Sequence, residues 1–117
     1  MNKGFNENVY RVAEILDNRN AEDIILIDIR EQSILADYFV ICSGKAANHV
    51  KVLADELEDK LGKEGIRPVR KEGYQEGRWI VLDYGEVLVH IFQPEVRAFY
   101  DIEHLWADGK ITEIPEV

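Results

Sequence analysis

The residues whose types could do chemistry lie in the stretch GRWIVLDYGEVLVHIF, Gly77 to Phe92, where Asp83 and His90 interrupt two mostly apolar runs. An imidazole and a carboxylate can act as an acid–base pair, and a carboxylate can bind a divalent metal ion. Metal-dependent phosphoryl or nucleotidyl transfer needs at least two converging carboxylates. Asp83 has no Asp-x-Asp companion, because positions 81 and 85 are Val and Gly. We therefore predict no catalytic residue, no metal site and no cofactor.

A second candidate is the turn CSGKAANH, Cys42 to His49, between a predicted strand and a predicted helix. Backbone amides at a helix start can receive an anion, but P-loops and dinucleotide loops need more glycines than the one present here. A nucleotide-binding or nucleotidyltransferase enzyme using this strand–SGK–helix turn is the alternative functional hypothesis, and a tight turn with Ser43 as helix cap is the structural one. Cys42 could act as a nucleophile with His49 or His90 as its base, although a lone cysteine ending an apolar strand is usually a core residue.

Composition and charge narrow the class of protein. The chain has 117 residues, 46% of them apolar and 32% charged, which is typical of one globular domain. Its net charge of −9 argues against non-specific binding to DNA or other nucleic acid. A single cysteine excludes an intrachain disulfide, and no run reaches the roughly 18 apolar residues of a membrane span. We expect a cytoplasmic protein that does not contact a membrane.

One segment departs from the acidic background. Residues 60 to 78 carry six bases, Lys60, Lys63, Arg67, Arg70, Lys71 and Arg78, and three acids, Glu64, Glu72 and Glu76. A solvated helix end and loop explains such a run, and so does a surface that meets an anionic partner.

The elements that must position Asp83 and His90 follow from hydrophobic periodicity. Helical spacing predicts a helix in the first 18 residues, capped by Asn6, and a longer helix whose apolar stripe runs from Val50 to Leu61. Pro94 predicts the first turn of another helix, followed by a further turn at 102–106. The predicted strands are 23–29, 37–43, a short edge strand within RPVRKEG, and a hairpin of 79–83 and 87–92 around Tyr84-Gly85.

This order predicts a single α/β domain over residues 1–108, with a mixed sheet of about five strands and flanking helices, and a short C-terminal tail over 109–117. A strand–helix–strand path implies a parallel pair of strands, whereas the hairpin implies antiparallel ones. About three helices can cover one face of such a sheet fully and the other face only in part. The partly open face is a candidate binding surface.

The register of the hairpin decides what that face presents. A two-residue turn at Tyr84-Gly85 places Trp79 opposite His90, and a three-residue turn shifts the pairing by one. In the first register, one face carries Trp79, Val81, Asp83, Glu86, Leu88 and His90. A large aromatic ringed by polar groups is typical of a protein contact, and a half-buried structural His and Trp is the alternative.

Three blocks of the chain are DYFVICSGKAANHVKVLADELEDKL, RWIVLDYGEVLVHIF and RAFYDIEHLW. In this order and spacing they resemble the ribosomal silencing factor family, RsfS or Iojap, over about Val9 to Trp106. The resemblance implies a nucleotidyltransferase-like fold without the acidic active site of true transferases. It also implies that the protein docks on the large ribosomal subunit through ribosomal protein L-fourteen, and so blocks small-subunit joining and represses translation. Homodimers when free, and a part in large-subunit maturation, are implied as well.

The family patterns fall on numbered positions of this chain. Trp-x-x-x-Asp-x-Gly falls on Trp79, Asp83 and Gly85, and a His-Ile-Phe strand end falls on 90–92. Arg-x-x-Tyr-x-x-Glu-x-Leu-Trp falls on 97–106. The turn at 42–45 departs from the Thr-Gly-Thr/Ser form associated with the family, which weakens the anion-site hypothesis.

From these patterns we predict a partner-binding surface rather than an active site. Its predicted residues are Arg70, Lys71, Arg78, Trp79, Asp83, His90, Arg97 and Tyr100. Trp79 is the expected anchor. The three basic residues before it are expected to give orientation and a salt-sensitive association rate near rRNA or acidic protein side chains. Asp83 and His90 are expected to orient the strand ends, with the helix of Arg97 and Tyr100 packed beside them.

Overall fold

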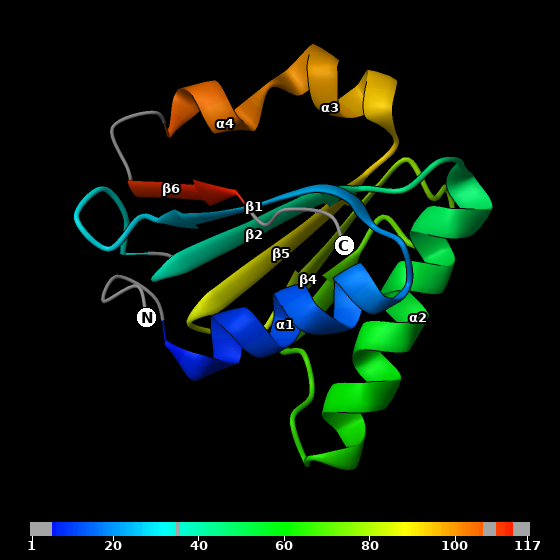
Figure 1. Ribbon diagram of the computed structural model, residues 1–117, viewed down its shortest axis with the longest axis horizontal. Coiled ribbons are helices and arrows are strands. Elements are labelled where there is room, and N and C mark those ends of the chain that lie inside the picture. Colours follow the sequence, from blue (N-terminus) through cyan, green and yellow to red (C-terminus); the bar gives the residue numbers. More distant parts are fainter. Residues whose placement is uncertain (1–5, 35, 107–109, 114–117) are drawn as a thin grey trace.

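A mixed sheet forms the middle layer of the molecule (Figure 1). The computed structural model describes residues 6–34, 36–106 and 110–113. Within these residues the sheet has six strands in the order β3-β4-β5-β2-β1-β6. The strands are β1 Glu22–Asp28, β2 Tyr38–Ser43, β3 Arg70–Glu72, β4 Trp79–Asp83, β5 Val87–Phe92 and β6 Lys110–Glu113. β2 and β5 are parallel and the other neighbours are antiparallel, which confirms the predicted α/β domain with a mixed sheet.

Helices cover the two faces of the sheet unequally. The helices α1 Glu7–Asn18 and α2 Ala47–Lys63 lie on one face, and the shorter α3 Pro94–Tyr100 and α4 Ile102–Leu105 lie on the other (Figure 1). Each face has its own cluster of buried apolar side chains. β2 is buried along its whole length, whereas burial alternates along β4. The second face is therefore less covered at β4 than at β2.

The main helix signals of the sequence are confirmed. Asn6 Oδ1 accepts a hydrogen bond from Val9 N at 3.1 Å and caps α1. The predicted apolar stripe of α2 is buried, and α3 begins with Pro94 in its first turn. The predicted cap at Ser43 is wrong, because α2 begins after Ala46 and has no side-chain cap.

A sixth strand lies where the sequence indicated only a tail. β6 pairs antiparallel with β1, with Ile111 opposite Ile27. β1 would otherwise present an unpaired edge, and an unpaired strand edge favours the addition of another strand. A four-residue strand formed by such long-range pairing leaves little local signal. The rest of segment 109–117 lies outside the described residues, so the domain boundary at 108 stays a prediction.

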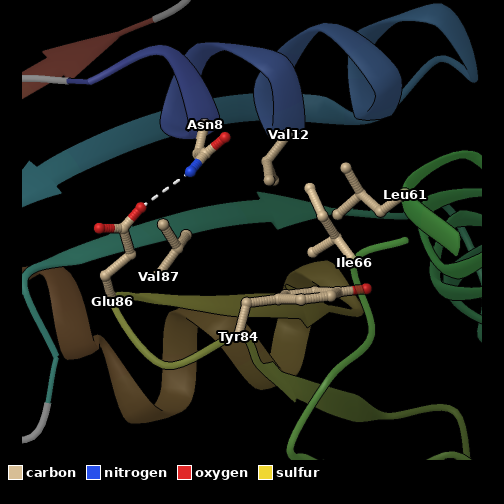
Figure 2. A pocket seen from close by; sticks show the side chains of 7 residues that line it. All are labelled: Asn8, Val12, Leu61, Ile66, Tyr84, Glu86 and Val87. Carbon is tan, nitrogen blue, oxygen red and sulfur yellow. Dashed lines mark hydrogen bonds between the residues drawn. The ribbon is translucent and has the colours of Figure 1, made fainter. Parts of the chain in front are cut away.

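The turn of the β4–β5 hairpin is fixed against α1. Glu86 Oε1 accepts hydrogen bonds from Asn6 Nδ2 and Asn8 Nδ2 at 3.1 and 3.0 Å. Beside them lies a pocket of about 40 Å³ with the Tyr84 ring along one side and Val12 on the other (Figure 2). The Tyr84 hydroxyl is buried without a hydrogen-bond partner among the described residues, and burial raises the pKa of Tyr84 to about 12. This end of the hairpin is packed rather than free.

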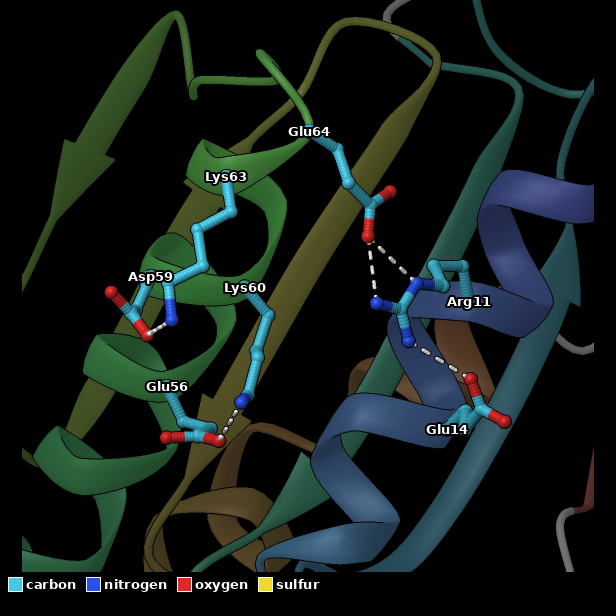
Figure 3. Close-up of polar contacts among 7 residues, drawn as sticks. All are labelled: Arg11, Glu14, Glu56, Asp59, Lys60, Lys63 and Glu64. Atoms are coloured by element: carbon cyan, nitrogen blue, oxygen red, sulfur yellow. Dashed lines mark hydrogen bonds and ion pairs between the residues drawn. The ribbon is translucent and has the colours of Figure 1, made fainter.

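Ion pairs connect α1 to the end of α2. Arg11 Nη2 lies 2.6 Å from Glu64 Oε2, and Arg11 Nη1 lies 2.9 Å from Glu14 Oε1 (Figure 3). Two further pairs lie along α2 in the same view. Exposed pairs of this kind each contribute at most about 1 kcal/mol to stability. Buried apolar contacts therefore hold the helices on the sheet, and the charges add little.

Gly73 is required by a close approach of the chain to β4. Its φ is +81°, and a Cβ built there would lie 2.0 Å from the carbonyl oxygen of Trp79. Gly65 has almost the same φ, +80°, with nothing within 4 Å of its Cβ position. The two glycines thus share the backbone conformation and differ in the space around them.

We expect Gly73→Ala to lower the free energy of unfolding by about 3 kcal/mol or more, because it combines a left-handed residue with a clash against backbone. Gly65→Ala is the matched control and is expected to cost only about 1 kcal/mol, for the positive φ alone. Urea denaturation measures both. Equal losses in the two variants would show that the contact with the Trp79 carbonyl is unimportant.

Candidate docking surface

The hairpin register places the side chains predicted to bind a partner. Trp79 pairs with Phe92, Val81 with His90, and Asp83 with Leu88. The turn residues are Gly85 and Glu86, so the predicted turn at Tyr84-Gly85 is wrong by one residue and the pairing moves by two. An even shift keeps every side chain on its predicted face, except that Phe92 replaces Glu86 there.

Two local features set this turn. Gly85 has a φ of +86°, which suits the first central position of a two-residue hairpin loop. The Asp83 carboxylate accepts a hydrogen bond from Gly85 N at 2.8 Å. Asp83 therefore stabilises the turn, as expected for a residue that orients the strand end.

Six partly or fully exposed side chains on this side of the sheet form a surface that we call the docking face. It comprises Trp79, Val81, Asp83 and Leu88 of the hairpin with Phe99 and Tyr100 of α3. The first four are half-buried, and Phe99 and Tyr100 are 80% and 50% exposed. Phe99 was missed in the sequence because the helical period does not distinguish an apolar residue facing the core from one facing solvent.

Trp79 is held at the centre of the docking face by rings from two elements, β5 and α3. Its indole stacks on Phe92 with 4.8 Å between centroids and lies 5.0 Å from the Tyr100 ring. Its Nε1 donates a hydrogen bond to His90 Nδ1 at 3.1 Å. The predicted anchor is thus both partly exposed and fixed in orientation.

His90 lies beneath Trp79 and does not face a partner. Its side chain is 6% exposed, and burial lowers its pKa from 6.5 to about 4. At neutral pH the imidazole is uncharged, and Nδ1 must be the unprotonated nitrogen because the indole N–H only donates. Of the two interpretations left open by the sequence, the structure therefore supports the structural His, which is buried rather than half-buried.

The three predicted basic residues do not share one face. Arg70 lies opposite Asp83 and so shares the side of the docking face, whereas Lys71 lies opposite Leu82 on the side of α1 and α2. Lys71 Nζ lies 2.8 Å from Glu58 Oε1 of α2. The expectation that Lys71 lines the same surface as Trp79 is therefore wrong, because strand alternation turns it away.

Arg78 adjoins the docking face. It is exposed, has no ion-pair partner among the described residues, and lines a pocket of about 170 Å³. Trp79, Val96, Tyr100 and Glu76 line the same pocket. Arg78 is thus placed where a partner that contacts Trp79 would also meet it.

Arg97 has a structural position instead. Its side chain is 11% exposed, with Nε 3.1 Å from Glu103 Oε2 and Nη1 donating to Ser43 Oγ at 2.9 Å. It thereby joins α3, α4 and the end of β2. Ser43, predicted as a helix cap, is an acceptor in this connection.

The turn after β2 has few free groups for an anion or a nucleophile. Gly44 N donates to Phe92 O at 2.8 Å, and Lys45 N donates to His49 Nδ1 at 2.9 Å. Cys42 is fully buried, and burial raises its pKa to about 12, so its thiol is protonated at neutral pH. These contacts argue against the alternative nucleotide site and the thiol enzyme.

The described residues offer neither a metal-binding cluster nor a membrane-spanning helix. They contain no group of three or more His, Cys, Asp or Glu side chains that could hold a metal ion. None of their helices has the length and apolar character needed to span a membrane.

The buried His90 should make stability depend on pH. With a pKa of about 4 folded and 6.5 unfolded, the unfolded chain binds the proton more readily, so folded-state stability falls as pH drops through 6.5 towards 4. We expect wild type to lose about 2 kcal/mol more than His90→Gln between pH 7 and pH 5. Urea denaturation at both pH values measures this difference. Parallel curves for the two proteins would contradict the buried, neutral imidazole.

Comparison with known proteins places this chain in a family. The family model described as "Ribosomal silencing factor during starvation", RsfS, matches residues 2–117. The ribosomal silencing factor RsfS of Bacillus subtilis is 37% identical over 102 residues, covering 87% of this chain and 86% of that protein. The mouse "Mitochondrial assembly of ribosomal large subunit protein 1" is 31% identical, covering 81% of this chain and 43% of its own length.

Solved structures agree with the sequence relatives. A Chromobacterium violaceum protein of known structure is 33% identical, with a TM-score of 0.83 over 86% of this chain and 85% of that one. A Bacillus halodurans structure is 31% identical, with a TM-score of 0.78 over 94% of this chain and 99% of that one. Fold, sequence pattern and family model therefore converge, and the chain belongs to the ribosomal silencing factor RsfS family.

Proposed function

We propose that this protein represses translation by docking on the large ribosomal subunit, through ribosomal protein L-fourteen, and blocking its association with the small subunit. The observation that carries the proposal is Trp79, half-exposed yet fixed among Phe92, Tyr100 and His90 on the docking face. Large aromatic side chains in well-packed surroundings supply most of the energy of protein interfaces. The name of the mouse relative, which refers to the large ribosomal subunit, supports the same partner.

The proposed mechanism is steric and breaks no bond. A bound domain of this size covers a part of the large-subunit surface that the small subunit must contact. Asp83 stabilises a turn and Cys42 is a buried, protonated thiol, so these two predicted candidates for chemistry have structural positions. The relatives named as silencing factors are likewise not named as enzymes.

Three further features belong to the proposal. The protein acts in the cytoplasm, where it meets assembled subunits, and it contributes to large-subunit maturation through the same docking. When it is free, two copies pair as a homodimer that covers the apolar part of the docking face. Exposed Phe99 and half-exposed Tyr100 beside Trp79 supply the apolar surface for such pairing.

Trp79→Ala tests the anchor. We expect it to weaken binding to purified large subunits by about 30-fold, since a central aromatic anchor is worth about 2 kcal/mol or more, and to abolish inhibition of subunit joining. Co-sedimentation and light scattering measure the two effects. Val52→Ala is the control, because Val52 is an exposed apolar residue of α2 and α2 covers the opposite side of the sheet. Wild-type binding by a folded Trp79→Ala protein would refute the proposed docking face.

Arg70 and Arg78 test the contribution of rRNA. If both contact phosphates, the double variant Arg70→Gln/Arg78→Gln should bind large subunits more weakly, and its log–log salt slope should fall by about 1 for each lost contact. Lys71→Gln is the matched control, because Lys71 pairs with Glu58 away from the docking face. If the salt slope of the double variant is unchanged, or if the control changes equally, Arg70 and Arg78 do not contact rRNA.

A further inference from the structure

The indole N–H of Trp79 is turned inward, towards the sheet. Its acceptor, His90 Nδ1, belongs to a side chain that is 6% exposed. An indole N–H is a donor only, and leaving it buried without an acceptor would cost the full desolvation of that group. The exposed part of Trp79 is therefore made up of its carbon atoms.

The imidazole is fixed by its neighbours. Phe39 meets it edge-on with 4.7 Å between ring centroids and an interplanar angle of 66°. Phe92 lies nearly parallel to it, at 6.2 Å and 13°, and also stacks on Trp79. These rings restrict rotation of His90, so the direction of its acceptor nitrogen is set by the packing of β2 and β5.

This arrangement leaves the other ring nitrogen of His90 without a hydrogen bond in the described part of the chain. Its Nε2 is buried and has no hydrogen-bond partner among the described residues. Because Nδ1 accepts from Trp79, the proton of the neutral ring lies on Nε2, which leaves one buried donor unsatisfied. An apolar side chain at this position would carry no unsatisfied donor, so packing alone does not explain the imidazole.

We propose that His90 is a positioning residue, whose Nδ1 holds the Trp79 indole so that only its carbon atoms face the partner. This inference rests on the proposed function for the role of Trp79 as anchor. It assigns the partner an apolar contact at this point: aliphatic groups, or the methylene stem of a long side chain, lie against the indole, and no acceptor of the partner bonds to its N–H. Recognition by Trp79 is then a matter of shape and apolar area.

A double-mutant cycle tests whether His90 acts through the indole. His90→Phe is expected to weaken large-subunit binding about tenfold in wild type, because the indole N–H loses its acceptor and the ring reorients. In a Trp79→Phe background, which has no N–H, the same change is expected to alter affinity by less than about twofold. Equal factors in the two backgrounds would overturn the proposal. His90→Gln, whose amide oxygen can accept, is expected to restore most of the affinity.

Nuclear magnetic resonance of the free protein tests the geometry without the ribosome. At pH 7 we expect imidazole nitrogen shifts of the Nε2–H tautomer and a Trp79 indole N–H protected from exchange, identified by its loss in Trp79→Phe. Protection should disappear in His90→Phe and persist in His90→Gln. A proton on Nδ1 in wild type would overturn the proposal even if no variant folds. If wild type has this geometry but does not bind large subunits, the proposed function fails and the positioning of Trp79 stands.

Discussion

The constraint on which the structure depends is that both faces of the central parallel pair, β2 and β5, must be covered. α1 and α2 cover one face with continuous apolar stripes. The other face has only α3 and α4, of seven and four residues. These two short helices shield β2 and the end of β5, and they leave β4 with alternating burial. The docking face therefore exists because the helices on this side are too short to cover β4, and not because of any insertion.

The hairpin that carries the docking face is fixed at both ends. At the turn, Glu86 is hydrogen-bonded to Asn6 and Asn8. At the other end, Gln93 Nε2 donates to Gly77 O at 2.9 Å, and Gln93 N donates to Arg78 O. A surface that is already ordered loses little conformational entropy when it binds. This rigidity suits a protein whose proposed action is to occupy space.

Local signals in the sequence predicted most of the fold. The Asn6 cap, the α2 stripe and Pro94 act within a few residues of themselves, and each is confirmed. β6 was not foreseen because its pairing with β1 joins distant segments. The nucleotidyltransferase-like label of the fold stays a prediction.

The docking face was predicted only in part, for the same reason. Trp79 and Asp83 could be placed from strand alternation alone, and both lie on the expected face. The turn was misplaced by one residue because both Tyr84-Gly85 and Gly85-Glu86 contain the required glycine. Arg97 looked like a surface residue because its partners, Ser43 and Glu103, are set by tertiary packing. Lys71 was misassigned because the sequence predicts a short edge strand within RPVRKEG but not its register against β4.

The edge strand β3 lowers the tendency of the protein to aggregate. All three of its residues, Arg70, Lys71 and Glu72, are charged and exposed. Short, charged edges resist the strand-to-strand addition that begins aggregation. The apolar surface beside β3 can therefore be exposed, as it is before two copies pair, without strand-by-strand polymerisation starting at the adjoining sheet edge.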